Sequence, residues 1–271
     1  SFSKSLRLMG NNFTITVVSE DRITADCHID IAIAEIQRIE KLFTTFDPNS
    51  QTNLINEYAG IKPVVVDEEV FKLIERSITI SNLTQGAFDI TYGSIDKGLW
   101  NFDTNMTALP SHEIAKKMVY LINYRNIILN KEQLSVMLLN KGMRIGFGGI
   151  GKGYAAEMAK KKLVERNVLS GIINASGDLT TWGTQASGKP WTIGIAHPDH
   201  PSSAFSCLNI SGKAIATSGN YEKCIIINGK KFSHTIDPKT GFPVTGIKSV
   251  TVISNNAELA DAMATPIAVM G

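Results

Sequence analysis

The chain has 271 residues, of which 43% are hydrophobic and 19% are charged. This is enough to bury a core in one large domain or in two coupled lobes. The net charge of +2 gives no electrostatic reason to expect a nucleic-acid partner. The three cysteines, Cys27, Cys207 and Cys224, are too few and too scattered to predict a disulfide framework or a zinc site.

No apolar run reaches the length of a membrane span, and the N-terminus lacks the apolar core of a signal peptide. The chain nevertheless opens on Ser1 rather than Met. We therefore expect that an upstream segment was removed, so the missing leader says little about location.

The expected elements mix helices and strands without a regular β–α–β repeat, which favours an α+β fold. Apolar spacing predicts a helix over 30–46 with Asp30 as its N-cap, and a second helix capped by Asp67. Further helices are expected at 111–121, at 152–166 and from about 256. A structured loop is expected at 86–103. Strands are expected at 13–18, 64–66, 126–129, 134–139, 171–174, 191–196, 205–210, 224–228 and 248–253.

A glycine-rich run over 146–153 precedes the helix expected at 152–166. It fits the dinucleotide-binding pattern G-x-G-x-x-G, but no acidic residue follows at the distance that pattern needs. It also fits a P-loop, except that Gly153 stands where a magnesium-binding Ser or Thr is required. Two interpretations stay open. The run brings backbone N–H groups to a phosphate, or it is a tight strand-to-helix turn.

Asp261 and Thr265 are four residues apart, so on a helix they project from the same face. A carboxylate and a hydroxyl are hard oxygen ligands that suit Mg²⁺. Such a pair in isolation is more often a plain helix surface, and its weight here comes from the other motifs. His234, next to a turn at 237–241, is either a structural residue or a general base.

Ordered sequence blocks along the chain resemble the ApbE family of FAD:protein FMN transferases, or flavin transferases. The resemblance runs from Leu8 to the C-terminus. The blocks that carry it are 8–10, 46–50 with Asn56, 86–91, 148–155, 174–178, 216–221, 233–241 and 260–265.

The resemblance implies an enzyme that binds FAD and a divalent metal, Mg²⁺ or Mn²⁺. Such an enzyme moves FMN onto a Thr or Ser hydroxyl of an acceptor protein and releases AMP. Acceptors in this family include subunits of membrane redox complexes. The implied fold is a single α+β domain over 1–271, with FAD and metal in a cleft between two tightly coupled lobes. The implied location is the bacterial cell envelope, periplasmic or lipid-anchored outside the cytoplasmic membrane.

The matching motif positions imply roles for particular residues. Asp261, Thr265 and the backbone carbonyl of Gly149 become metal ligands, and His234 becomes the catalytic base. The residues implied to line the flavin site are Met9, Phe46, Asp89, Lys152, Asp178, Thr217 and Ser218.

The sequence departs from the family pattern at two places. Gly146-Phe147 stand where the family often has Asp-Leu. Pro266 stands where Ala is common, and a proline there is expected to kink the helix or to start a new turn.

Three alternatives remain beside the transferase. A metal-dependent FAD pyrophosphatase, giving FMN and AMP, would use the same site with water as the nucleophile. A non-catalytic FAD-binding protein would retain intact FAD. A nicotinamide oxidoreductase would follow from the G-x-G-x-x-G match alone.

Overall fold

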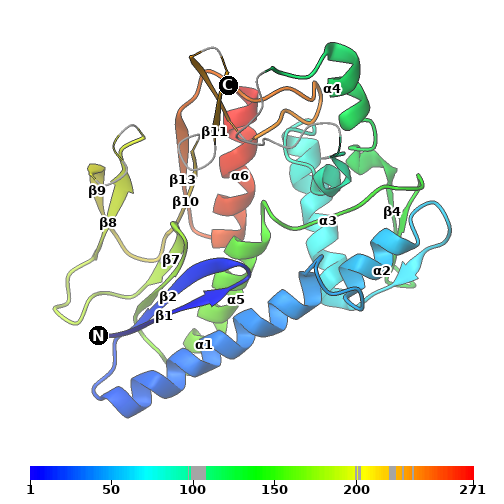
Figure 1. Ribbon diagram of the computed structural model, residues 1–271. Helices are drawn as coiled ribbons and strands as arrows, with labels where there is room; N and C mark the ends of the chain where they lie inside the picture. Colours follow the sequence, from blue (N-terminus) through cyan, green and yellow to red (C-terminus); the bar gives the residue numbers. More distant parts are fainter. Residues whose placement is uncertain are drawn as a thin grey trace. The chain divides into compact units, whose positions relative to one another are not determined.

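The computed structural model describes residues 1–96, 98, 108–198, 200, 203–219, 224–227, 229–233 and 235–271. It confirms a mixture of helices and strands without regular alternation (Figure 1). The chain divides into two compact units. The first comprises 1–41, 149–218 and 250–264, and the second comprises 42–148, 219–249 and 265–271. The single family domain and its cleft stay predictions.

The first unit is built on a six-stranded sheet of order β1-β2-β6-β7-β10-β13. Its strands are β1 (Phe2–Leu8), β2 (Asn11–Val17), β6 (Gly171–Ala175), β7 (Asp178–Trp182), β10 (Ala214–Gly219) and β13 (Ser249–Ser254). Burial in β2 alternates, and Phe13, Ile15 and Val17 are fully buried. Helix α5 (Gly151–Val164) packs on β6 and β7. A separate hairpin joins β8 (Trp191–Ala196) to β9 (Ala204–Ile210).

The second unit combines helices with a three-stranded sheet of order β3-β5-β4 and a two-stranded sheet of β11 and β12. Its elements are α2 (Gln51–Glu57), β3 (Val64–Val65), α3 (Glu68–Leu83), η1 (Ile90–Ser94), α4 (His112–Met118), η2 (Tyr124–Asn126), β4 (Ile127–Asn130), β5 (Ser135–Leu138), β11 (Cys224–Ile227) and β12 (Lys230–Ser233). Met118, Ile225, Phe232 and Ile236 form an apolar cluster that ties α4 to the β11–β12 hairpin. Helices α1 (Arg22–Phe43) and α6 (Ala257–Met270) each contribute residues to both units.

The prediction that Asp30 caps a helix is wrong, whereas Asp67 is confirmed as the N-cap residue of α3 but without a side-chain capping bond. Helix α1 begins at Arg22, where the Asp21 carboxylate accepts from the Thr24 backbone N–H at 2.9 Å. Asp30 lies inside this helix and pairs with Lys4 on an exposed face. Asp67 does stand at the N-cap of α3, but its side chain makes no capping bond and instead accepts from Gln51.

Several short elements were not predicted, namely β1, α2, β7, β10 and β12. Helix α6, by contrast, continues through Pro266 to Met270, so the proline does not start a new element. A proline costs a helix one backbone hydrogen bond, and the buried residues Ala260, Ala262, Ala264 and Ala268 show that packing holds this helix in place.

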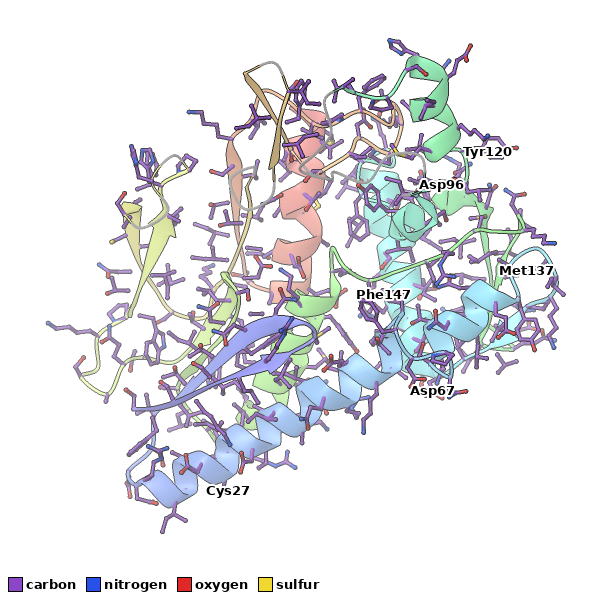
Figure 2. All side chains as sticks on the ribbon, viewed as in Figure 1. Cys27, Asp67, Asp96, Tyr120, Met137 and Phe147 are labelled. Carbon is purple, nitrogen blue, oxygen red and sulfur yellow. The ribbon has the colours of Figure 1, made fainter. Side chains whose placement is uncertain are left out.

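Phe147, one of the two departures from the family pattern, is a core residue. It is buried and packs edge-on against Phe43, with ring centroids 4.8 Å apart (Figure 2). An offset edge-to-face pair of this kind adds to the apolar burial energy. Phe147 therefore anchors the beginning of the glycine run in the core.

Helices α5 and α6 approach each other closely at Gly153. A Cβ at this position would lie 2.6 Å from the Asp261 Cβ and 2.8 Å from the Ala257 carbonyl carbon. No real Cβ tolerates such distances, and part of the obstacle is backbone. The sequence left two interpretations open for the glycine run, a set of N–H groups for a phosphate or a close-packed turn. At Gly153 the structure supports the second, because the glycine is needed for helix packing.

We predict that Gly153→Ala destabilises the protein by about 1–3 kcal/mol or more, because the added methyl forces α6 away from α5. Gly148→Ala is the matched control, since a Cβ there meets nothing within 4 Å. Urea unfolding of both variants measures the difference. Equal stability of the two variants would contradict the close approach.

Candidate functional site

Two tight turns lie at one end of the six-stranded sheet. Met9-Gly10 joins β1 to β2, and Ser176-Gly177 joins β6 to β7, with all four residues at positive φ. The Ser176 N–H donates to the Asn12 carbonyl at 3.0 Å, which holds the turns together. Met9, predicted to line the flavin site, therefore lies at the same sheet end as the residue that begins β7.

Asp178 begins β7 at this sheet end. Its Oδ1 accepts from the Thr217 backbone N–H at 3.1 Å, and its Oδ2 forms an ion pair with Lys152 Nζ. The side chains of Asp178 and Lys152 are only 9% and 24% exposed. A charge pair so removed from water interacts more strongly than a surface pair. Three of the predicted flavin-site residues are thus joined in one network.

Asp261 lies beside this network on α6. Its carboxylate accepts from the Gly153 N–H at 2.8 Å and from the backbone N–H of Lys152. The residue is 6% exposed, and burial raises its pKa to about 6. The Lys152 charge opposes this rise, whereas the Asp178 charge adds to it. The start of α5 therefore holds two carboxylates around one lysine.

Thr217 links β10 to its neighbour in the sheet. Its hydroxyl lies 3.0 Å from the Thr251 hydroxyl on β13. Thr251 was missed by sequence reasoning, although it lies within a strand that was predicted. Ser218, the next residue of β10, is partly exposed.

Gly149 and Thr265 complete the predicted metal ligands. Thr265 is half-buried and lies one turn after Asp261 on the continuous helix α6, as the spacing predicted. Gly149 lies two residues before α5 begins. In a regular helix the Gly153 N–H would donate to the Gly149 carbonyl, four residues earlier. Here α5 begins only at Gly151, and the Gly153 N–H donates to the Asp261 carboxylate instead.

Two predicted flavin-site residues, Phe46 and Asp89, belong to the second unit. Phe46 is 96% exposed, an unusual environment for a phenyl ring. Asp89 Oδ1 accepts from the Thr91 N–H and hydroxyl, and its Oδ2 accepts from the Tyr124 N–H at 2.8 Å. The side chain therefore holds η1 against η2.

His234, the predicted catalytic base, lies outside the described residues. The chain that follows it is anchored, because the Ile236 N–H donates to the hydroxyl of the partly buried Tyr92 at 3.3 Å. The Thr235 N–H donates to the Ser233 hydroxyl at 3.0 Å.

Within the described ranges, no three His, Cys, Asp or Glu side chains are grouped closely enough to bind a metal by themselves. A cation at Asp261 would therefore need hydroxyl, carbonyl or water oxygens as well. None of the helices in these ranges combines the length and apolar character needed to cross a membrane.

Comparisons with known proteins give one consistent result. The sequence profile of the ApbE family matches residues 9–271. An FAD:protein FMN transferase of Klebsiella pneumoniae is 32% identical over 94% of this chain and 78% of its own length. One from Escherichia coli is 29% identical over 86% of this chain and 68% of its own.

Solved structures agree. The crystal structure of the ApbE protein of Thermotoga maritima matches 99% of this chain and 86% of that one, with a TM-score of 0.88 and 30% identity. The apo flavinyl transferase ApbE of Pseudomonas stutzeri matches with a TM-score of 0.85 at 24% identity, which supports the fold.

We predict that Asp178→Ala destabilises the protein by about 2–4 kcal/mol, because it leaves the Lys152 charge poorly compensated in a buried place. Adding Lys152→Met should recover part of the loss, and a double-mutant cycle from urea unfolding measures the coupling. The control is Asp30→Ala, whose exposed pair with Lys4 should contribute less than about 1 kcal/mol. Strictly additive effects of the two site substitutions would refute the proposed coupling.

Proposed function

This chain belongs to the ApbE family, and on that premise we propose that it transfers FMN from FAD to a Thr or Ser hydroxyl of an acceptor protein. The reaction needs Mg²⁺ and releases AMP. Family membership confirms the resemblance read from the sequence. The structural observation that supports the proposal most directly is the network of Lys152, Asp178 and Asp261 at the start of α5.

The residues around Asp261 fit a hard divalent cation. Burial makes the ionised carboxylate costly, as the pKa of about 6 shows, and a bound cation would offset that cost. The Thr265 hydroxyl and the Gly149 carbonyl are donors of the same oxygen class, and Mg²⁺ usually keeps several waters as well. When bound there, Mg²⁺ would supply charge neutralisation at the pyrophosphate of FAD. Mn²⁺ suits the same oxygen donors.

The protein's own side chains have separate roles in the proposal. The Lys152 ammonium, held by Asp178, provides positive charge for phosphate oxygens. Met9, Phe46, Thr217, Ser218 and Asp89 contribute to FAD binding. His234 accepts the proton of the acceptor hydroxyl as its oxygen bonds to the FMN phosphorus. The bond from that phosphorus to the bridging oxygen breaks, and AMP leaves.

We place the acceptors among subunits of membrane redox complexes, and the enzyme in the bacterial cell envelope outside the cytoplasmic membrane. The family resemblance supports both statements. Fractionation of the source cells tests the second, and recovery of the protein only in the cytosolic fraction would refute it.

The test of the activity is mass spectrometry of an acceptor fragment with a flavinylation-type Thr, incubated with the protein, FAD and Mg²⁺. We expect the fragment to gain one FMN, with an equal amount of AMP, and EDTA to stop both. AMP and free FMN without modified acceptor would instead support the pyrophosphatase. Intact FAD throughout would refute catalysis.

We predict that Asp261→Asn removes Mg²⁺-dependent transfer, because an amide is a far weaker ligand than a carboxylate.

In wild-type protein, Mg²⁺ should raise the melting temperature more at pH 7 than at pH 5, since protonation of Asp261 below about pH 6 competes with the cation. Without Mg²⁺, the folded protein holds the Asp261 proton more tightly than the unfolded chain does, because the pKa is raised on folding. The free energy of unfolding should therefore fall as pH rises from about 4 to 6.

Two further variants separate metal binding from catalysis. Thr265→Ser keeps the hydroxyl and should retain the Mg²⁺-induced shift, whereas the near-isosteric Thr265→Val should lose it. His234→Ala should retain both the shift and FAD binding, yet slow transfer by about 10²–10⁴-fold. An unchanged transfer rate in His234→Ala would eliminate it as the base.

A further inference from the structure

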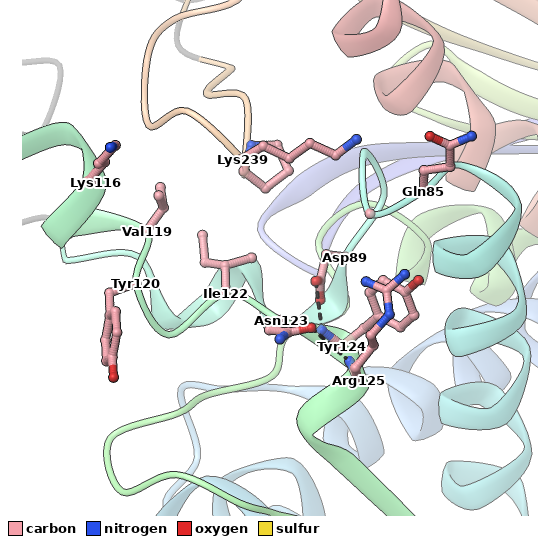
Figure 3. A pocket seen from close by; sticks show the side chains of 12 residues that line it. Gln85, Asp89, Lys116, Val119, Tyr120, Ile122, Asn123, Tyr124, Arg125 and Lys239 are labelled. Atoms are coloured by element: carbon pink, nitrogen blue, oxygen red, sulfur yellow. Dashed lines mark hydrogen bonds between the residues drawn. The ribbon is translucent and has the colours of Figure 1, made fainter. Parts of the chain in front are cut away.

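The second unit contains a cavity of about 330 Å³, and Asp89 is the only described residue of its lining that the proposed function assigns to FAD binding. It lies between the end of α3, the last turn of α4 with the chain that follows it, and the turn that contains Lys239 (Figure 3). The volume is at the lower end of the range for small-molecule sites.

Positive charge dominates the described lining of this cavity. Lys116 on α4, Arg125 and Lys239 all line it, and Figure 3 shows Lys116 and Arg125 on opposite sides. Lys116 and Lys239 form no ion pair with any residue that the structure describes. Lys117 also lies in the last turn of α4, where the helix dipole favours cations. Of these two neighbouring lysines, Lys116 lines the cavity and Lys117 does not.

Asp89 is the only acid among the described lining residues, against the three cations Lys116, Arg125 and Lys239. Both its oxygens already accept hydrogen bonds, from Thr91 and from the Tyr124 N–H. Burial raises the pKa of Asp89, whereas its hydrogen bonds and the Arg125 charge act in the opposite direction, so this single acid offsets at most one of the three cations. The cavity therefore carries an excess of positive charge.

The remaining walls offer polar groups and flat apolar surface. Tyr124 is 3% exposed, its hydroxyl has no hydrogen-bond partner among the described residues, and the Arg125 guanidinium lies 4.7 Å from its ring centre. Gln85 lines the cavity from a left-handed backbone conformation, φ 53°, that non-glycine residues rarely adopt. Tyr120, which is 80% exposed, and Ile122 also line the cavity.

We infer that this cavity binds a small organic anion, one in which a phosphate or carboxylate group is joined to a flat apolar part. Lys116 and Lys239 bind the anionic group, and Tyr120 and Ile122 contact the apolar part. The described lining includes none of the proposed metal ligands Gly149, Asp261 and Thr265.

The test is isothermal titration of the full chain with phenyl phosphate, benzoate and inorganic phosphate at low salt. We expect phenyl phosphate or benzoate to bind more tightly than inorganic phosphate, because only these two carry a ring. The stronger of the two identifies the preferred anionic group. Affinity should fall as salt is added. Failure of all three probes to bind would overturn the inference.

Variants locate the binding. The double variant Lys116→Ala, Lys239→Ala should weaken the best probe by about tenfold or more, since charge-assisted hydrogen bonds are lost. Both lysines are exposed, so the fold should be retained, and a melting curve checks this. Lys117→Ala is the matched control and should bind as wild type. Unchanged affinity in the double variant would overturn the inference.

Competition with FAD decides whether the site is separate. The family resemblance assigns Asp89 to the flavin site, although its oxygens are bound within the second unit here. We expect saturating FAD to leave probe binding intact. Complete displacement of the probe by FAD would assign the cavity to the flavin site and overturn the inference.

Discussion

The rest of the proposed site depends on one interaction, the hydrogen bonds that the buried Asp261 carboxylate of α6 accepts from the start of α5. The carboxylate accepts the Gly153 N–H, and the absence of a side chain at Gly153 lets α6 come this close. Once the two helices are joined there, Lys152 lies in the first turn of α5 within reach of Asp178. Asp178 in turn holds the backbone of β10 through Thr217. One close contact between helices therefore positions side chains from four separate segments.

This arrangement is expensive in electrostatic terms. Two carboxylates and one ammonium lie in a region largely closed to water, and the raised pKa of Asp261 records the imbalance. Burying charge without full compensation lowers stability. Proteins retain such imbalance where a ligand restores it. The positive excess of the second-unit cavity is a related case with the opposite sign, because there the lysines lack a compensating acid.

The sequence predicted the parts of this protein that depend on local pattern. The four-residue spacing of Asp261 and Thr265 places them on one helix, and most of the long helices and strands appear where apolar periodicity indicated. Asp30 was mistaken for a cap because the first turns of α1 look polar, although Ala25 and Ile29 are buried. Strand β7 was missed because all five of its residues are buried, Asp178, Thr180 and Thr181 among them, so it lacks the alternation that marks a strand.

Long-range packing accounts for the rest. Nothing within the glycine run reveals that Gly153 faces a helix 108 residues further along the chain. The pairing of Thr217 with Thr251 depends on the sheet order, which places β10 beside β13. Asp89 was read from family position as a flavin residue, and the structure adds that its oxygens hold η1 against η2. Such contacts become visible only when the strands and helices are arranged in space.

The separation of these contacts along the chain also bears on how the protein assembles. Lys152 meets Asp178 across 26 residues, and Asp178 meets Thr217 across 39, but Gly153 meets Asp261 only when a segment of 108 residues closes. Contacts between distant segments form late in folding, because the chain loses entropy before they can form. The sheet-end contacts that Lys152 and Thr217 make with Asp178 therefore close shorter loops than the contact that brings Asp261 to Gly153. A chain truncated before α6 would keep the residues of the first two contacts and lack the proposed metal ligand.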